Sequence, residues 1–151
     1  MEKQLKNIDD AYKWSVETVN ALRAGDFSKI DMEELINEIG SIASGLRREL
    51  VSALRRTIEA LLIVEYTSAS EEVREDSDRQ LVHAQGQLQL LVDAAPSLNL
   101  ILGEAVEEAY RDARQFVTED YGVAFPERCP LSLEHIMEDP YERLVVAGQP
   151  R

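Results

Sequence analysis

Two stretches of this chain carry clusters of acidic residues at helical spacing, and carboxylates are the side chains here that could most readily take part in catalysis or metal binding. The first cluster is Glu33, Glu34 and Glu38, and the second is Glu104, Glu107, Glu108 and Asp112. Carboxylates that project from facing helices are how several helical-bundle enzymes hold Mg²⁺. A Mg²⁺- or Mn²⁺-dependent helical-bundle hydrolase is therefore one hypothesis for this protein.

The spacing of the first cluster weakens the hydrolase hypothesis. Helical nucleotide pyrophosphatases resemble an E-E-x-x-E pattern followed by E-x-x-D, whereas here Asn37 stands at the third acidic position and Glu38 follows it. Glu34 and Glu38 also lie away from the apolar stripe of their helix. We therefore prefer a solvated acidic face, and we expect no metal and no cofactor.

The arginines are concentrated in one part of the chain, at positions 47, 48, 55 and 56. Arg48 and Arg55 share a helical face opposite the leucines. Their partners on the same helix are poor, because Arg48 meets Ser52 one turn later. We expect pairing with carboxylates of a neighbouring helix. Arg48, Arg55 and Arg56 remain candidate binding residues for an anion or an acidic partner.

Other catalytic groupings are not visible in the sequence. The chain has two histidines and one cysteine, and it has no glycine-rich phosphate-binding loop. A single cysteine permits no intramolecular disulfide, which is typical of a reducing compartment.

Length and charge limit the function classes further. The length of 151 residues predicts a single domain over residues 1–151. The chain is 44% hydrophobic and carries a formal net charge of −13. So acidic a chain is a poor nucleic-acid or anionic-membrane binder. No run approaches 18 apolar residues, and the N-terminus lacks the apolar core of a signal peptide. We expect a cytoplasmic protein without a membrane partner.

Helices are the elements that must position these residues. From Leu35 to Leu61, apolar residues recur every three or four positions, which predicts a helix over 32–66, capped by Asp31. Similar patterns predict helices over 10–24, 71–94 and 98–121, the last opened by Ser97, and no strand. The expected fold is all-α: an up-down bundle of four main helices, about residues 9–122, around the long second helix.

The first helix is expected to pack through an apolar stripe at Tyr12, Val16 and Val19. Trp14 lies roughly 200° from Tyr12 around the helix and leaves this stripe. It is therefore a candidate binding residue. The alternative is that it packs beneath the turn at residues 26–27.

A proline-rich strap and a short helix are expected after the bundle, over about residues 123–140, with a loose tail at 141–151. Pro126 and Pro130 favour extended backbone, and Ser132 can cap the short helix. The apolar residues available for burial are Phe125, Leu131, Leu133 and Ile136. We expect the strap to pack across the bundle, with Cys129 inward and His135 in a structural role.

The end of the long helix predicts self-association. Residues 61–64 are apolar on every side, and the helix expected to cover them begins with a polar stretch. We predict a homodimer formed partly through this surface.

Several segments together resemble the bacterial family known as domain of unknown function 29, common in cyanobacteria and proteobacteria. The segments are Trp14, LRAGDFSKIDMEELINEIGSI, RREL, APSLN, AYRDAR and FPERCPLSLEHIM. The resemblance extends from about Asp10 to Ile136. It implies an all-helical fold and supplies no activity.

The leading functional hypothesis is a non-enzymatic protein-interaction or adaptor protein with an unknown protein partner. The hydrolase that uses the two acidic clusters is the alternative. A weaker alternative is a nucleic-acid-associated protein that binds through its arginines.

Overall fold

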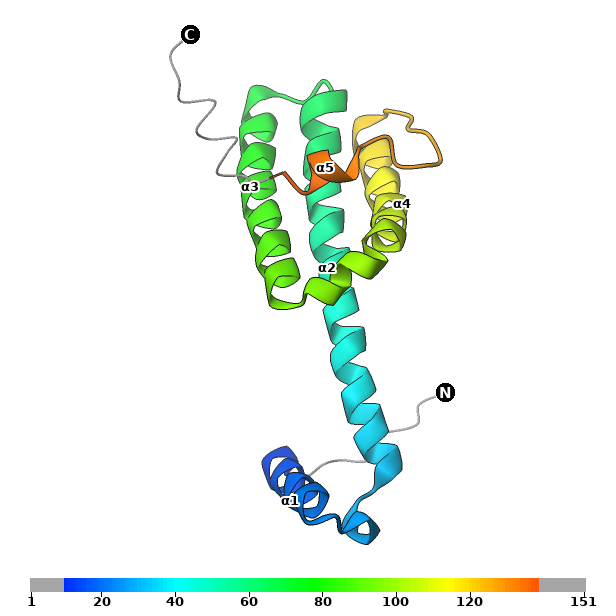
Figure 1. Ribbon diagram of the computed structural model, residues 1–151. Coiled ribbons are helices and arrows are strands. Elements are labelled where there is room, and N and C mark those ends of the chain that lie inside the picture. The colour runs from blue at the N-terminus through cyan, green and yellow to red at the C-terminus, as the bar shows by residue number, and fades with distance from the viewer. Residues whose placement is uncertain (1–9, 139–151) are drawn as a thin grey trace. The chain divides into compact units, whose positions relative to one another are not determined.

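The computed structural model describes residues 10–138, and all regular structure in this range is helical (Figure 1). The α-helices are α1 (Ala11–Ala24), α2 (Met32–Tyr66), α3 (Glu71–Ala94), α4 (Leu102–Tyr121) and α5 (Leu133–Ile136). Short 3₁₀ helices, η1 (Phe27–Lys29) and η2 (Pro96–Ile101), precede α2 and α4. The described residues contain no strand, so the all-α prediction is confirmed. The predicted tail over 141–151 lies outside this range.

Local capping chemistry explains the helix ends. Each N-cap side chain accepts a hydrogen bond from the backbone N–H three residues later, which satisfies a donor that the helix start leaves unpaired. The caps and their N···O distances are Asp10 (2.9 Å), Asp31 (3.1 Å), Ser70 (3.4 Å) and Ser132 (3.2 Å). Gly25 and Gly122 end α1 and α4 with φ values of 69° and 68°. One boundary was wrong: Pro96 begins η2, and α4 starts at Leu102 rather than after Ser97.

The length of α2 raises the question of a membrane span, and its composition answers it. The helix has 35 residues, more than a bilayer requires. Glutamates and arginines interrupt its apolar stretches. Within the described part of the chain, no helix combines the length and the apolar character that crossing a membrane requires.

The chain divides into two compact units, and the division falls inside α2, between Ala43 and Ser44. The first unit contains α1, η1 and the first turns of α2. The second contains the rest of α2 together with α3, α4 and α5. Each unit has its own pattern of burial, and each is described by itself below.

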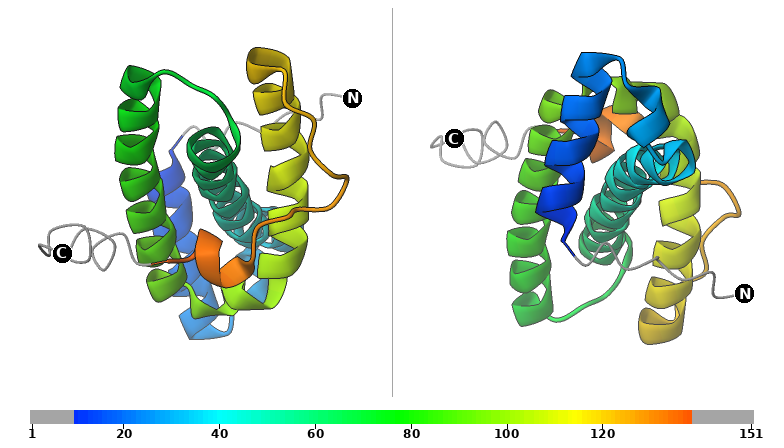
Figure 2. Two further views of the ribbon diagram at one scale, coloured as in Figure 1. Left: turned by 90° about the horizontal axis from the view of Figure 1, so that it is seen from above. Right: turned by 90° about the horizontal axis from the view of Figure 1, so that it is seen from below.

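The second unit is built around the buried stretch of α2. Leu50, Leu54, Ile58 and Leu61 expose no surface, so the predicted leucine seam is confirmed over this half of the helix. Helices α3 and α4 lie on either side of α2, and α5 crosses the side that they leave open (Figures 1 and 2). Their core residues include Leu81, Leu88, Ala109, Tyr110 and Val117.

The end of α2 is covered within the chain, contrary to the prediction. Residues 61–63 are all buried. The strap supplies part of the cover, because the Phe125 ring meets Tyr66 edge-on with 6.1 Å between ring centroids. Ile136 joins the same core. The apolar end of α2 on which the homodimer prediction rested is therefore covered in part by the strap, a contact between distant segments that residue spacing does not encode. The homodimer itself stays a prediction.

Much of the strap is held by its backbone. The Tyr110 hydroxyl donates a hydrogen bond to the Pro126 carbonyl at 2.7 Å, and the Arg114 guanidinium donates to the same oxygen at 3.2 Å. Farther along, the Gln85 amide donates to the Ile136 carbonyl at 3.3 Å. Side chains of α3 and α4 thus satisfy carbonyls that a non-helical segment would otherwise leave unpaired.

Side chains of the strap complete the docking. Ile136 is fully buried and Cys129 is half-buried, and burial raises the pKa of the Cys129 thiol. Nε2 of His135 lies 2.6 Å from Oε1 of Glu65, which agrees with a structural role for His135. Leu133 is 45% exposed, so its predicted burial is wrong.

In the first unit, the buried face of α1 is not the face that was predicted to be buried. Tyr12, Val16 and Val19 are exposed, whereas Thr18 and Ala21 on the other face are buried. The apolar stripe was recognised correctly. No described residue of the first unit covers it. A stripe identifies an apolar face and does not identify what packs on it.

Replacing Ile136 by alanine should lower the free energy of unfolding of the second unit by about 2–4 kcal/mol, because the substitution leaves a cavity under the docked strap. Leu133→Ala is the matched control on the same helix, and its half-exposed side chain should cost about 0.5 kcal/mol or less. Urea denaturation followed by circular dichroism measures both. Equal effects of the two variants would show that α5 is not docked through Ile136.

Candidate functional site

The three arginines predicted to bind lie together on one face of α2 in the second unit. At 100° per residue, Arg48, Ser52 and Arg55 fall in one line along the helix, with Arg56 beside it. All four are exposed, on the side opposite the buried leucines. We call this face, formed by Arg48, Ser52, Arg55 and Arg56, the arginine ridge.

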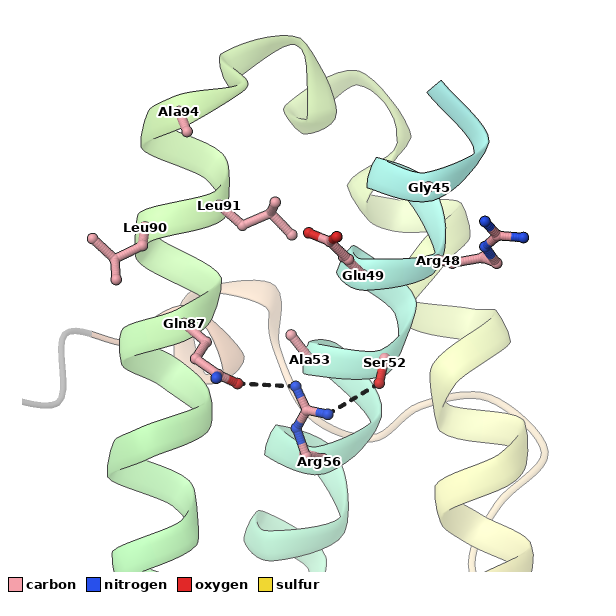
Figure 3. A pocket seen from close by; sticks show the side chains of 10 residues that line it. All are labelled: Gly45, Arg48, Glu49, Ser52, Ala53, Arg56, Gln87, Leu90, Leu91 and Ala94. Atoms are coloured by element: carbon pink, nitrogen blue, oxygen red, sulfur yellow. Dashed lines mark hydrogen bonds between the residues drawn. The ribbon is translucent and has the colours of Figure 1, made fainter. Parts of the chain in front are cut away.

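A groove runs along each side of the arginine ridge. The groove between α2 and α3 has a volume of about 690 Å³ and is lined by Arg48, Ser52 and Arg56 from α2 and by Gln87, Leu90 and Leu91 from α3 (Figure 3). The groove toward α4 is smaller, about 240 Å³, and includes Arg48, Arg55 and Asp112. Arg48 and Ser52 line both grooves, so the ridge separates two adjacent surface hollows.

Arg56 is held in place by neutral partners. Its guanidinium donates to the Ser52 hydroxyl at 3.1 Å and to the Gln87 side-chain oxygen of α3 at 2.9 Å (Figure 3). Neither acceptor carries a charge. The guanidinium is therefore oriented across the groove, and its remaining N–H donors and its positive charge are available to an anion.

Arg47 and Arg48 are neighbours in sequence but differ in their partners. Arg47 donates to Glu108 at 2.6 Å and to Glu104 at 3.0 Å, both on α4. The hydrogen bond from Arg47 lowers the pKa of Glu108. Arg48 makes no hydrogen bond or ion pair with any other residue between 10 and 138. Its side chain points away from α3 into solvent (Figure 3).

Arg55 is intermediate between these two cases. It forms an ion pair with Glu59, one turn later on α2, with 3.5 Å between Nε and Oε1. Pairing with another helix was expected for the whole group. Among the arginines at 47, 48, 55 and 56, only Arg47 pairs with a carboxylate of another helix in the described structure.

Trp14, the fourth predicted binding residue, belongs to the first unit. It is half-buried, and it lies on the side of α1 that also carries the buried Thr18 and Ala21. Its position off the apolar stripe was predicted correctly. A binding role for Trp14 remains a prediction.

The acidic residues of the hydrolase hypothesis are divided between the units. Glu33, Glu34 and Glu38 lie in the first unit, and Glu104, Glu108 and Asp112 lie in the second. Two members of the second cluster bind Arg47, as described above. Across residues 10–138, no three His, Cys, Asp or Glu side chains converge as metal ligands.

Sequence reasoning missed an acidic groove near the far end of α2. It has a volume of about 580 Å³, and its lining includes Glu59, Glu72, Asp76, Phe116 and Tyr121 from three helices. Burial raises the pKa of Glu59, and nearby arginines partly oppose this effect. Its residues come from three separate parts of the chain, so no local sequence signal marks it.

A second missed feature is the environment of His135. Nδ1 of this histidine lies 3.6 Å from Oε2 of Glu138, so the ring stands between Glu138 and Glu65. The spacing of Glu138, three residues after His135, was visible in the sequence. The contact with Glu65, 70 positions away, was not.

Comparison with protein families found one relevant match. The family model described as "Domain of unknown function DUF29" matches residues 8–142, which is most of the chain. Neither the curated proteins nor the solved structures provided a match. The family match confirms the resemblance in the sequence, and its description assigns no activity.

Replacing Glu59 by glutamine should change how stability depends on pH. Burial raises the folded-state pKa of Glu59 above the ordinary glutamate value of 4.5, so the folded protein binds this proton more tightly than the unfolded chain does. The resulting stability is complete below the unfolded pKa and is lost as pH rises through the folded pKa. The unfolding free energy of Glu59→Gln relative to wild type should therefore increase between about pH 4 and pH 7 in urea titrations. A decrease over this range would contradict the assignment.

Proposed function

Because this chain belongs to the DUF29 family, whose description assigns no activity, we propose a function from its geometry alone. The proposal is a non-enzymatic interaction or adaptor protein that binds an acidic, partly apolar peptide segment along the arginine ridge. The observation that carries it is Arg48. In a chain with 29 carboxylates, this arginine has no partner within the described residues, while its neighbour Arg47 has two.

Charge supports an acidic occupant in spite of the net charge of −13. At physiological salt, charges more than about 8 Å apart are largely screened from one another. The charges that line the groove therefore decide which segment binds there. The groove toward α3 is lined by two positive side chains, Arg48 and Arg56, and by one carboxylate, that of Glu49. Arg56 is already oriented by Ser52 and Gln87, so binding would cost little further ordering of its side chain.

Apolar surface on the same groove supports a peptide rather than a simple anion. Leu90 is exposed on its wall, with Leu91 half-buried beside it. An aliphatic side chain from a partner could cover these leucines while an acidic side chain reaches Arg48. Such a combination is the usual arrangement for short segments that bind helical surfaces.

The test is selection of random peptides of about twelve residues on the immobilised full-length chain. The enriched peptides should combine Asp or Glu with Leu or another large apolar residue. Arg48→Gln should weaken binding of a selected peptide by about tenfold, roughly the loss of one charge-assisted hydrogen bond. Fluorescence anisotropy measures the dissociation constant.

Other outcomes of this test would contradict the proposal. Enrichment of basic peptides would place binding elsewhere, because basic peptides do not complement the arginine ridge. Tight binding of single-stranded DNA of about 20 nucleotides, lost in Arg48→Gln, would favour the nucleic-acid alternative. A rise of several degrees in melting temperature with Mg²⁺ or Mn²⁺ would favour the hydrolase alternative.

A cytoplasmic location remains a prediction from composition.

Arg47→Gln is the matched control, one position away from Arg48. It should leave peptide affinity unchanged, because Arg47 is already engaged by Glu104 and Glu108. It should lower the free energy of unfolding only slightly, since solvent screens these partly exposed ion pairs. Arg48→Gln should leave the free energy of unfolding within about 0.5 kcal/mol of wild type. If both variants lose stability equally, Arg48 has a structural role.

A further inference from the structure

The first unit exposes most of its large apolar side chains. Nine of the fourteen large hydrophobic residues that are exposed in the described structure belong to it, although it is much the smaller unit. Tyr12 is 81% exposed, and Ile36 and Ile42 are 65% and 66% exposed. Single exposed apolar residues are ordinary on protein surfaces, but a concentration of this kind marks an interaction surface.

The first unit also has too small a core to be stable by itself. Its buried apolar residues in the described range are Ala21 and Ile30, joined by Thr18. The unit ends at Ala43, which puts it close to the size of about 40 residues below which a disulfide, a metal or an association partner is usually needed. An isolated helix as short as the 14-residue α1 is marginal in water. The unit therefore needs a covering surface that is present whenever the chain is folded.

The exposed apolar residues form one stripe on each helix of the unit. At 100° per residue, Tyr12, Val16, Val19 and Leu22 fall within an arc of about 120° on α1. Met32, Ile36, Ile39 and Ile42 fall within an equal arc on α2. The glutamates at 33, 34 and 38 lie outside the α2 arc. Arg23, in the last turn of α1, is the one charged residue within the α1 arc. An added Cβ at Gly40, at the edge of the α2 arc, would meet no atom within 4 Å.

We propose that these two stripes form a homodimer interface, with the first unit of a second copy as the occupant. The eight exposed side chains of the two stripes, at on the order of 100 Å² each, supply roughly the 800 Å² per partner that a standard interface buries. A surface that associates with its own copy must be nearly free of charge, because a two-fold axis brings like residues together. The two stripes meet that condition.

A second copy fits this requirement better than another protein does. A unit that needs a cover in order to fold requires a partner made in the same amount at the same time, and a second chain always fulfils this condition. The inference goes beyond the proposed function and does not depend on the arginine ridge, which lies entirely in the second unit.

Sedimentation equilibrium of the full-length chain tests the proposal. At about 100 μM the mass should be that of two chains, and Ile39→Glu should raise the dimer dissociation constant by at least about 100-fold, because it places a charge in the interface. Leu100→Glu is the matched control. Leu100 is also an exposed apolar residue, but it lies in the second unit, so this variant should remain dimeric. A monomeric wild type, or a dimeric Ile39→Glu variant, would overturn the proposal.

Two further measurements on the wild-type chain do not depend on a variant that folds. Amide hydrogen exchange in α1 and in residues 32–43 should slow as the protein concentration rises from about 5 to 200 μM, because dimerisation stabilises the first unit. Dimerisation should also strengthen with salt, since screening reduces repulsion between two acidic chains. Peptide binding at the arginine ridge should weaken with salt, so the two proposals can fail separately. Exchange that does not depend on concentration would overturn the dimer.

Discussion

Between Leu50 and Ile63, α2 carries buried apolar side chains on every side except the one that bears Ser52, Arg55 and Arg56, and so wide an apolar face must be covered. The second unit satisfies this constraint with two long helices beside α2 and a short one across it. The strap is part of this cover, since α3 and α4 leave one side of α2 open. The same constraint directs outward the side of α2 that carries the arginines.

A difference of one position separates a structural arginine from a candidate binding arginine. Residues 47 and 48 project about 100° apart around α2. Arg47 therefore reaches two carboxylates of α4, while Arg48 extends over the surface between the grooves. Three of the ten arginines between residues 10 and 138 form ion pairs with carboxylates, namely Arg47, Arg55 and Arg79. Arg48 is distinguished from the other unpaired arginines by its place between two adjacent grooves.

The sequence predicted what depends on local chemistry. The start of α2 at Met32 agrees with the Asp31 cap, and the buried seam from Leu50 onward follows from periodicity. It did not predict which apolar surfaces this chain covers. The end of α2 was expected to be left uncovered by the rest of this chain, and it is buried. The stripe at Tyr12 was expected to be buried, and it is exposed. Both results depend on contacts between distant segments, which residue spacing does not encode.

The way in which the bundle holds the strap has an evolutionary consequence. Tyr110, Arg114 and Gln85 all recognise carbonyl oxygens of the strap, at Pro126 and Ile136. Every amino acid supplies an identical carbonyl, so substitutions at most strap positions leave these bonds intact. Substitutions should therefore be tolerated at most positions of the strap, and they should be rare at the three residues that donate these hydrogen bonds. Homologous chains should therefore conserve the three donor side chains while the exposed residues of the strap vary.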